Sequence, residues 1–201
     1  MSVALAQGQS LWEPGAPLSF IYFPTTSILS LVVTHADGRS VEALTVGPDG
    51  FAGNVDLADP NQAAMSVTVL LGGEAVRTPL DALRLHLSDP HVRLALDRFR
   101  SQAVEQIARN AACIAFHPIL RRLSRWLLTV HDYGSQDELH LTHEQIAAKL
   151  AVQRPTVTLA LATLESEGLV ADSRRRVAIL NRNGLRAVAC PCYRTPKSGS
   201  V

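Results

Sequence analysis

Apolar and polar positions follow a strand-like pattern in the first part of the chain and a helical period after it. Between Gln7 and Arg77, short runs rich in β-branched and aromatic residues are separated by Gly, Pro and Asp. Several short strands at this spacing predict a β-roll or barrel. Asp37-Gly38 lies between two apolar runs and predicts a hairpin, because Gly accepts the positive φ of a tight primed turn. The expected strands are Phe20–Phe23, Ile28–Thr34, Val41–Val46, Ser66–Leu71 and Ala75–Thr78.

A second pattern, from Leu141 to Glu167, consists of two short helical periods separated by Ala151-Val152-Gln153. Thr142 is expected to cap the first helix while the side chain of Gln145 reaches back to the cap amide, which forms a capping box. Pro155 falls in the first turn of the second helix, where a missing N–H does no harm. Two helices joined in this way predict a helix-turn-helix motif. Its second helix would present polar groups to base edges and phosphates.

A basic turn follows the second helix. Gly168 ends that helix, and residues 169–180 have the pattern of a strand, a turn and a second strand, with three arginines at the tip. Charge runs are most often solvated turns, but cations beside a recognition helix can also neutralise phosphates. The pattern predicts a winged helix-turn-helix. The residues expected to contact DNA are Thr142, His143, Gln153, Arg154, Thr156, Thr158, Arg174, Arg175 and Arg176.

A long helix is expected between these two regions. A short helix is predicted from Pro79 to Ser88, and Pro90 begins a helix that extends to about Phe116. Apolar residues recur in it at intervals of three and four, so one side must be covered. The helix can pack on its own roll or on its copy in a second subunit; we favour the second, because a helix-turn-helix generally reads two half-sites with two copies. The interface residues would be Val92, Leu96, Phe99, Ala103, Ile107, Ala111 and Ile114.

Composition adds a charge asymmetry to this picture. The 201 residues are 47% hydrophobic, enough for one large domain or two small ones, and carry a net charge of +1. Residues 121–201 hold 12 Lys and Arg against 7 Asp and Glu, whereas the preceding residues hold 7 against 11. The basic part contains the predicted DNA-binding motif. No apolar run approaches the roughly 20 residues that span a bilayer, so a cytoplasmic protein without a membrane partner is expected.

The order of β-roll, long helix and winged helix-turn-helix resembles the Crp/Fnr superfamily of bacterial transcription regulators. The resemblance is carried by Leu11–Gly15, Ile21–Pro24, Val46–Gly53 and Leu141–Gly168. It implies an α+β chain with a cyclic-nucleotide-binding-like roll at 1–89, a dimerisation helix at 90–117 and a winged helix-turn-helix at 118–201. It also implies a homodimer that binds a palindromic operator in double-stranded DNA, with RNA polymerase as a candidate further partner.

The chain departs from the resemblance at the ligand positions. The family's cyclic-nucleotide sites keep a Glu for the ribose and an Arg for the cyclic phosphate, and the matching positions here are Asn54 and Ala64. Without that cation, cyclic nucleotide binding is not expected. The N-terminal cysteines of the iron–sulfur branch are missing, and His35, His86 and His91 show no haem-ligand pattern. The resemblance therefore leaves the signal unassigned, and the sequence requires no cofactor.

The recognition helix departs as well. Arg154 matches the family's guanine-contacting Arg, and Thr156 matches a phosphate-contacting Thr. Pro155 stands where Glu is usual, and Leu159 where Arg is frequent. Neither residue can make the polar base contact of the one it replaces, so the operator should differ from the family's best-known site.

Other classes of function have weaker sequence support. A cupin-like metalloenzyme needs several His and Glu in the roll, but only His35 lies in the strand region. A protein-interaction module with an inactive helix-turn-helix and a metal- or redox-responsive regulator remain alternatives. His140 with His143, and Cys190-Pro191-Cys192, are weak metal signals, because two thiols supply at most two zinc ligands and no local residue completes a tetrahedron. No catalytic, cofactor or metal site is therefore predicted.

Overall fold

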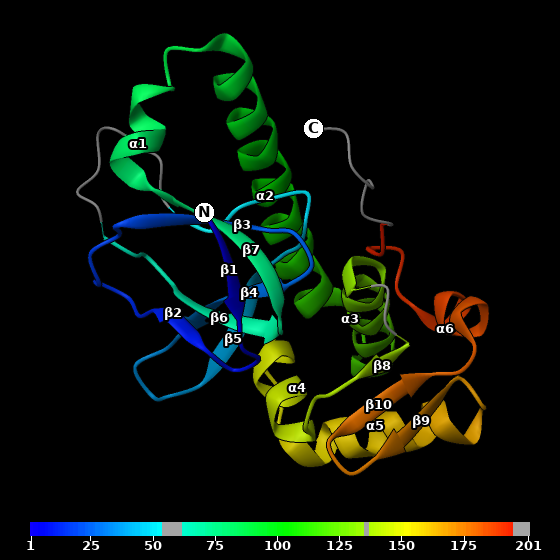
Figure 1. Cartoon of the computed structure of the whole chain (residues 1–201). Coiled ribbons are helices and arrows are strands. Elements are labelled where there is room, and N and C mark those ends of the chain that lie inside the picture. Colours follow the sequence, from blue (N-terminus) through cyan, green and yellow to red (C-terminus); the bar gives the residue numbers. More distant parts are fainter. Residues whose placement is uncertain (54–61, 135–136, 195–201) are drawn as a thin grey trace. The chain divides into compact units, whose positions relative to one another are not determined.

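The computed structural model describes residues 1–53, 62–134 and 137–194 (Figure 1). It has the predicted α+β architecture, with β-sheets first, a long helix next and a helix-turn-helix last. Two compact units can be distinguished. The first contains the described residues of Met1–Thr34 and Ala43–Ile107, and the second those of His35–Glu42 and Ala108–Pro196.

Two antiparallel sheets form the N-terminal part of the fold. One has the strand order β1-β7-β3 and the other β2-β6-β4-β5. The five strands expected from the sequence are confirmed, while β1 and β2 were missed because their short runs show no regular alternation. The strands are β1 (Ser2–Leu5), β2 (Ser10–Trp12), β3 (Phe20–Pro24), β4 (Ile28–Thr34), β5 (Ser40–Val46), β6 (Ser66–Leu71) and β7 (Gly73–Pro79).

The predicted hairpin connects β4 and β5. Gly38 has a φ of +84°, the left-handed conformation that glycine adopts without strain. Its N–H donates to the carbonyl of His35 at 2.9 Å, and the N–H of His35 donates to the carbonyl of Arg39 at 2.8 Å. The Asp37-Gly38 pair therefore forms the turn that the sequence predicts.

Helices α1 (Leu80–Leu85) and α2 (Pro90–Phe116) follow the strands. Leu96 of α2 is only 6% exposed, in a core cluster with Ile21, Phe51 and Leu80. The rings of Phe99 and Phe51 have centroids 4.7 Å apart. A Cβ at Gly50 would lie 2.1 Å from Cε2 of Phe99, so the ring needs a glycine below it.

These contacts show that part of the expected dimer interface also packs within its own chain. Leu96 is already covered by its own chain, and Val92, Phe99 and Ala103 pack against the same β-sheet cores. The apolar periodicity left open whether α2 packs on its own roll, and the first four of the expected interface residues do pack there. Further along α2, Ile107 and Ile114 are 38% and 43% exposed.

The second unit contains the helix-turn-helix and its wing. Strands β8, β10 and β9 form a small antiparallel sheet in that order. The core is made of leucine, isoleucine and valine side chains from every helix of the motif, including Leu127, Ile146, Leu161 and Leu185, each 0% exposed. Strand β8 was not predicted. The elements are α3 (Ile119–Gly134), β8 (Glu138–Leu139), α4 (His143–Leu150), α5 (Arg154–Ser166), β9 (Val170–Ser173), β10 (Arg176–Ile179) and α6 (Arg182–Val188).

Candidate nucleic-acid interface

Helix α4 begins with the capping box that the sequence predicts. The hydroxyl oxygen of Thr142 accepts a hydrogen bond from the N–H of Gln145 at 3.1 Å. In return, the N–H of Thr142 donates to Oε1 of Gln145 at 2.9 Å. Two amides that the helix itself leaves unpaired are thereby satisfied, which fixes where α4 starts.

The turn between the two helices contains a residue in the left-handed conformation. Ala151, the C-cap of α4, has a φ of +51°, a conformation that costs an L-residue roughly 1–2 kcal/mol. Gln153 occupies the N-cap position of α5, but its side chain makes no capping hydrogen bond and is exposed. Pro155 lies in the first turn of α5, as predicted.

Helix α5 has an inner apolar face and an outer face open to solvent. Val157, Leu161 and Leu164 are fully buried. Arg154 and Thr158 are exposed, Thr156 is half-buried, and Leu159 is 71% exposed. Leu159 therefore places an apolar side chain on the solvent-facing side of α5.

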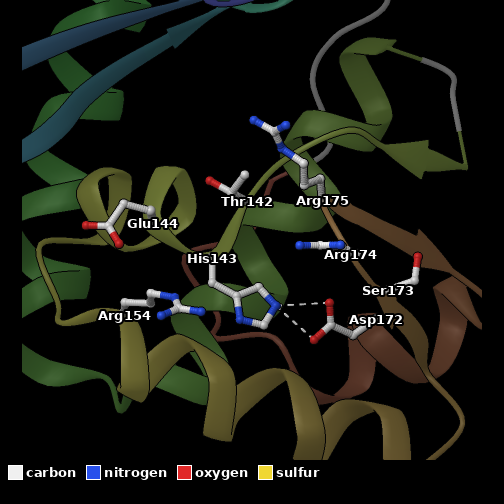
Figure 2. A pocket seen from close by; sticks show the side chains of 8 residues that line it. All are labelled: Thr142, His143, Glu144, Arg154, Asp172, Ser173, Arg174 and Arg175. Atoms are coloured by element: carbon white, nitrogen blue, oxygen red, sulfur yellow. Dashed lines mark hydrogen bonds and ion pairs between the residues drawn. The ribbon is translucent and has the colours of Figure 1, made fainter.

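The N-terminal ends of α4 and α5 and the wing enclose a surface hollow of about 350 Å³ (Figure 2). Three arginines and two acidic residues are among the residues that line it, so its lining is basic on balance. The hollow brings together most of the residues that the sequence predicted to contact DNA. Its lining residues are Thr142, His143, Glu144, Arg154, Asp172, Ser173, Arg174 and Arg175.

His143 connects the two helices to the wing. Its Nδ1 lies 2.9 Å from the hydroxyl oxygen of Thr158 on α5. Its Nε2 lies 3.0 Å from Oδ1 and 2.9 Å from Oδ2 of Asp172 on β9, and Figure 2 shows the ring directed at that carboxylate. Thr158 also donates to the carbonyl of Arg154 at 3.2 Å. Both side chains, predicted to contact DNA, thus have partners within the protein.

The three arginines of the wing differ in their surroundings. Arg175 is at the tip with a φ of +65°, and both it and Arg174 are exposed. Arg176 lies in β10, where its Nη1 is 3.1 Å from Oε2 of Glu138 on β8. Part of the charge of Arg176 is therefore neutralised within the protein, while Arg174 and Arg175 form no ion pair within the described part of the chain.

A group of potential metal ligands lies apart from this surface. Cys113 and His117, near the end of α2, meet Cys190 and Cys192, which follow α6. The sequence does not predict this meeting of the two thiol-bearing segments, because more than 70 residues separate them. The spacing of four residues between Cys113 and His117, at the end of a predicted helix, is the local signal of a shared site.

This arrangement of α4, α5 and the β8-β10-β9 sheet defines a winged helix-turn-helix of the DNA-binding type. Residues 121–188 match the Crp-like helix-turn-helix domain family. Together with the fold, this match supports a Crp/Fnr-type DNA-binding transcription regulator.

Relatives are similar in sequence over most of the chain, and solved structures are similar in fold. The chain is 26% identical over 190 residues to the CRP-like cAMP-activated global transcriptional regulator of Mycobacterium tuberculosis, covering 86% of this chain and 85% of that protein. It is 22% identical to the transcriptional regulator SdrP of Thermus thermophilus, covering 94% of each.

Among solved structures, TTHB099, a CRP-family transcriptional regulator of Thermus thermophilus, superposes with a TM-score of 0.81 at 20% identity, covering 96% of this chain and all of that one. FixK2 of Bradyrhizobium japonicum superposes with a TM-score of 0.78 at 15% identity, covering 94% of this chain and 97% of that one. At these identities the superpositions establish the fold. Among the described residues, no helix is both long and apolar enough to cross a membrane.

Proposed function

We propose that this protein is a sequence-specific regulator that binds a palindromic operator as a homodimer, with α5 as the recognition helix, and that it does so without cyclic nucleotide. The observation that carries the proposal is the position of Arg154. Its guanidinium is exposed at the start of α5 and faces the same hollow as Arg174 and Arg175. A base-reading cation beside a pair of phosphate-binding cations is the arrangement that major-groove docking requires.

Arg154 and Leu159 are the proposed base-reading residues. A guanidinium fork donates to O6 and N7 of guanine, which is the commonest specific contact in the major groove. Leu159, exposed five residues further along α5, is suited to an apolar contact with a thymine methyl group. Each half-site should therefore contain a guanine and, a few base pairs away, a thymine.

The backbone contacts are assigned to the wing and to the helix starts. Arg174 and Arg175 extend into solvent and would neutralise phosphates. Thr142, Gln153 and Thr156 lie where the backbone of a docked duplex would pass, since phosphates favour helix N-termini. For His143 and Thr158 we propose a second role in addition to the predicted contact: their mutual hydrogen bond sets the position of the wing relative to α5.

The dimer would form through the part of α2 that its own chain leaves exposed. Val104 is 67% exposed, Ile107 38% and Ile114 43%, and Ala111 is exposed between them. These four residues recur at intervals of three and four, so they share one helical face. A helix face of this kind pairs with its copy in the manner of a short coiled coil.

The N-terminal sheets would act as a sensor or as a scaffold for the dimer. The domains remain as proposed from the sequence: a roll at 1–89, a dimerisation helix at 90–117 and the DNA-binding part at 118–201. Ala64 is exposed and offers no charge to a cyclic phosphate. Asn54, the other substituted ligand position, lies outside the described residues.

Selection of binding sites from a random pool of double-stranded DNA, followed by sequencing, tests the proposal. The expected product is a palindrome with a guanine at a fixed position in each half. The same selection with Arg154→Ala protein should give a site in which that guanine is no longer required. Enrichment of no sequence above the starting pool, with and without cell extract, would contradict the proposal and favour a module whose helix-turn-helix does not bind DNA.

A further inference from the structure

Three thiols and one imidazole converge near the end of α2. The Sγ atoms of Cys113 and Cys190 are 3.4 Å apart, and Sγ of Cys192 is 3.6 Å from Nδ1 of His117. All four potential ligand atoms lie within 4.8 Å of one another. Cys113 and Cys190 are buried, whereas Cys192 and His117 are half-buried.

The local structure explains why these side chains meet. His117 directly follows α2, and its N–H still donates to the carbonyl of Cys113 at 3.1 Å, so its side chain projects from the same side as that of Cys113, four residues earlier in the helix. Cys190 and Cys192 flank Pro191, and the N–H of Tyr193 donates to the carbonyl of Cys190 at 3.0 Å, which closes a tight turn. The turn places both of its thiols on the same side as the helix pair.

Contacts outside the cluster hold the turn in place. The N–H of Cys190 donates to the carbonyl of Arg121 in α3 at 3.3 Å. The hydroxyl of Tyr193 donates to Oδ2 of Asp132 at 2.5 Å, and Arg182 bonds both Asp132 and Tyr193. The cysteine turn is thus anchored to α3 and α6 by bonds that do not involve the thiols, so the four ligands are arranged in advance of any metal.

We propose that Cys113, His117, Cys190 and Cys192 bind a single Zn²⁺ ion in a closed tetrahedral site. Three thiolates and one imidazole form a known structural zinc ligand set. Two sulfurs that are each about 2.3 Å from one tetrahedral ion lie about 3.8 Å apart, close to the separations seen here. With four protein ligands no position is left for water, so the ion acts in folding and not in catalysis.

The charge around the cluster suits a metal–thiolate site. Binding releases the protons of three thiols, and Zn²⁺ with three thiolates and a neutral imidazole keeps one net negative charge. The guanidinium of Arg125 favours the thiolate form of all three cysteines, and that of Arg122 favours the thiolate of Cys113. The Nε of Arg125 is buried without a hydrogen-bond partner in the described structure, so a nearby anion would stabilise it.

The free thiols show how strongly the cluster is coupled. A hydrogen bond from Cys190 is the main reason that the pKa of Cys113 falls to about 7, with Arg125 and Arg122 contributing. The same bond, with burial, raises the pKa of Cys190, and burial raises that of Cys192.

The same thiols could instead form a disulfide or ligate an iron–sulfur cluster, and the distances distinguish both from a zinc site. A disulfide between Cys113 and Cys190 needs its sulfurs about 2.05 Å apart, which requires movement from 3.4 Å. An iron–sulfur cluster places several atoms between its cysteine ligands, and a ligand set this compact encloses one ion instead. The spacing favours the single ion.

A bound ion would join the last turns of α2 to the segment that follows α6. The Cys113–Cys190 pair links positions 77 residues apart, and binding energy at such a site adds directly to folding energy. Removal of zinc should therefore lower the thermal stability of the full-length protein, in addition to any effect on DNA binding.

The test uses the full-length chain without a histidine tag, purified under reducing conditions and analysed for zinc, iron and thiol content. The expected result is about one zinc per chain, no iron and three reduced thiols. Replacement by Co²⁺ should give the intense visible absorption of tetrahedral cobalt together with a thiolate charge-transfer band. Protein without metal, protein with an iron–sulfur spectrum, or an intramolecular disulfide in reduced preparations would each overturn the proposal.

Variants separate ligation from folding. His117→Ala should lose zinc, His117→Cys should retain it as a four-thiolate site, and His91→Asn, on an exposed part of α2, should behave as wild type. A chelator should lower the melting temperature of the wild type but not that of His117→Ala. Should His117→Ala keep a full equivalent of zinc, or should the chelator leave the wild-type melting temperature unchanged, the four residues do not form this site.

Discussion

Nε2 of His143, in the first turn of α4, lies 2.9 Å from Oδ2 of Asp172 on the wing strand β9. The two residues are 29 positions apart in the chain, and their side chains are 20% and 17% exposed. Because the other ring nitrogen contacts Thr158 on α5, a single imidazole fixes three elements of the DNA-binding surface.

This relationship gives the first prediction. Asp172→Ala leaves a half-buried ring nitrogen without its partner, which should destabilise the protein by about 1–3 kcal/mol. Asp137→Ala is the matched control, because Asp137 pairs with His131 at 3.0 Å but its side chain is 83% exposed; that loss should be within about 1 kcal/mol. Urea unfolding measures the free energy of unfolding of both variants. Equal losses would show that the contact between His143 and Asp172 stabilises the protein no more than an exposed ion pair does.

Arg154→Ala should reduce specificity more than general affinity. Loss of a bidentate guanine contact should cost about 1–3 kcal/mol on the selected operator and relax the preference at one base pair in each half-site. On scrambled DNA the change should be much smaller. Binding isotherms on both duplexes measure the effect, and an identical factor on both would mean that α5 does not read this base.

Removal of the wing arginines should weaken binding to all sequences. Arg175→Ala should make the dependence of affinity on salt shallower by about one phosphate per subunit, since a released counterion carries no sequence information. Arg176→Ala, whose guanidinium already pairs with Glu138 at 3.1 Å, should change the slope less. A salt titration on specific and scrambled DNA compares the two, and a larger effect of Arg176→Ala would reverse the assignment.

The exposed face of α2 should hold the dimer together. Val104→Glu combined with Ile107→Glu would place like charges against their symmetry mates, so the subunits should separate. Gln102→Glu is the control: it is exposed and, two residues from Val104, lies on the opposite side of the helix. Sedimentation at micromolar concentration tests this, and a monomeric wild type, with or without DNA, would contradict it.

Cyclic AMP and cyclic GMP should not bind in the family's usual mode. Ala64 offers no guanidinium to the cyclic phosphate, and a neutral site leaves a desolvated phosphate uncompensated. Calorimetry with each nucleotide should detect no heat of binding, and the selected operator should be bound equally with and without it. Micromolar affinity for either nucleotide would show that another cation has taken the place of the missing arginine.

The sequence determined those features that depend on neighbouring residues. The capping box of Thr142 and Gln145 spans three positions, the Asp37-Gly38 turn spans two, and the strands and helices follow from local periodicity. These interactions form within a few residues of chain, so the identities of those residues are sufficient to predict them. The outward position of Arg154 follows in the same way, from its place at the start of an amphipathic helix.

Only the tertiary structure decided which distant residues meet. Periodicity showed that one side of α2 must be covered, but not that Leu96 and Phe99 are covered by Ile21, Phe51 and Leu80 of the same chain. It also could not bring Cys113 to Cys190, because a pairing across 77 residues depends on how helices and turns pack rather than on any local preference. The hydrophobic effect is non-directional. The sequence therefore predicts that one face of a helix is buried, but only the folded structure shows which residues cover that face.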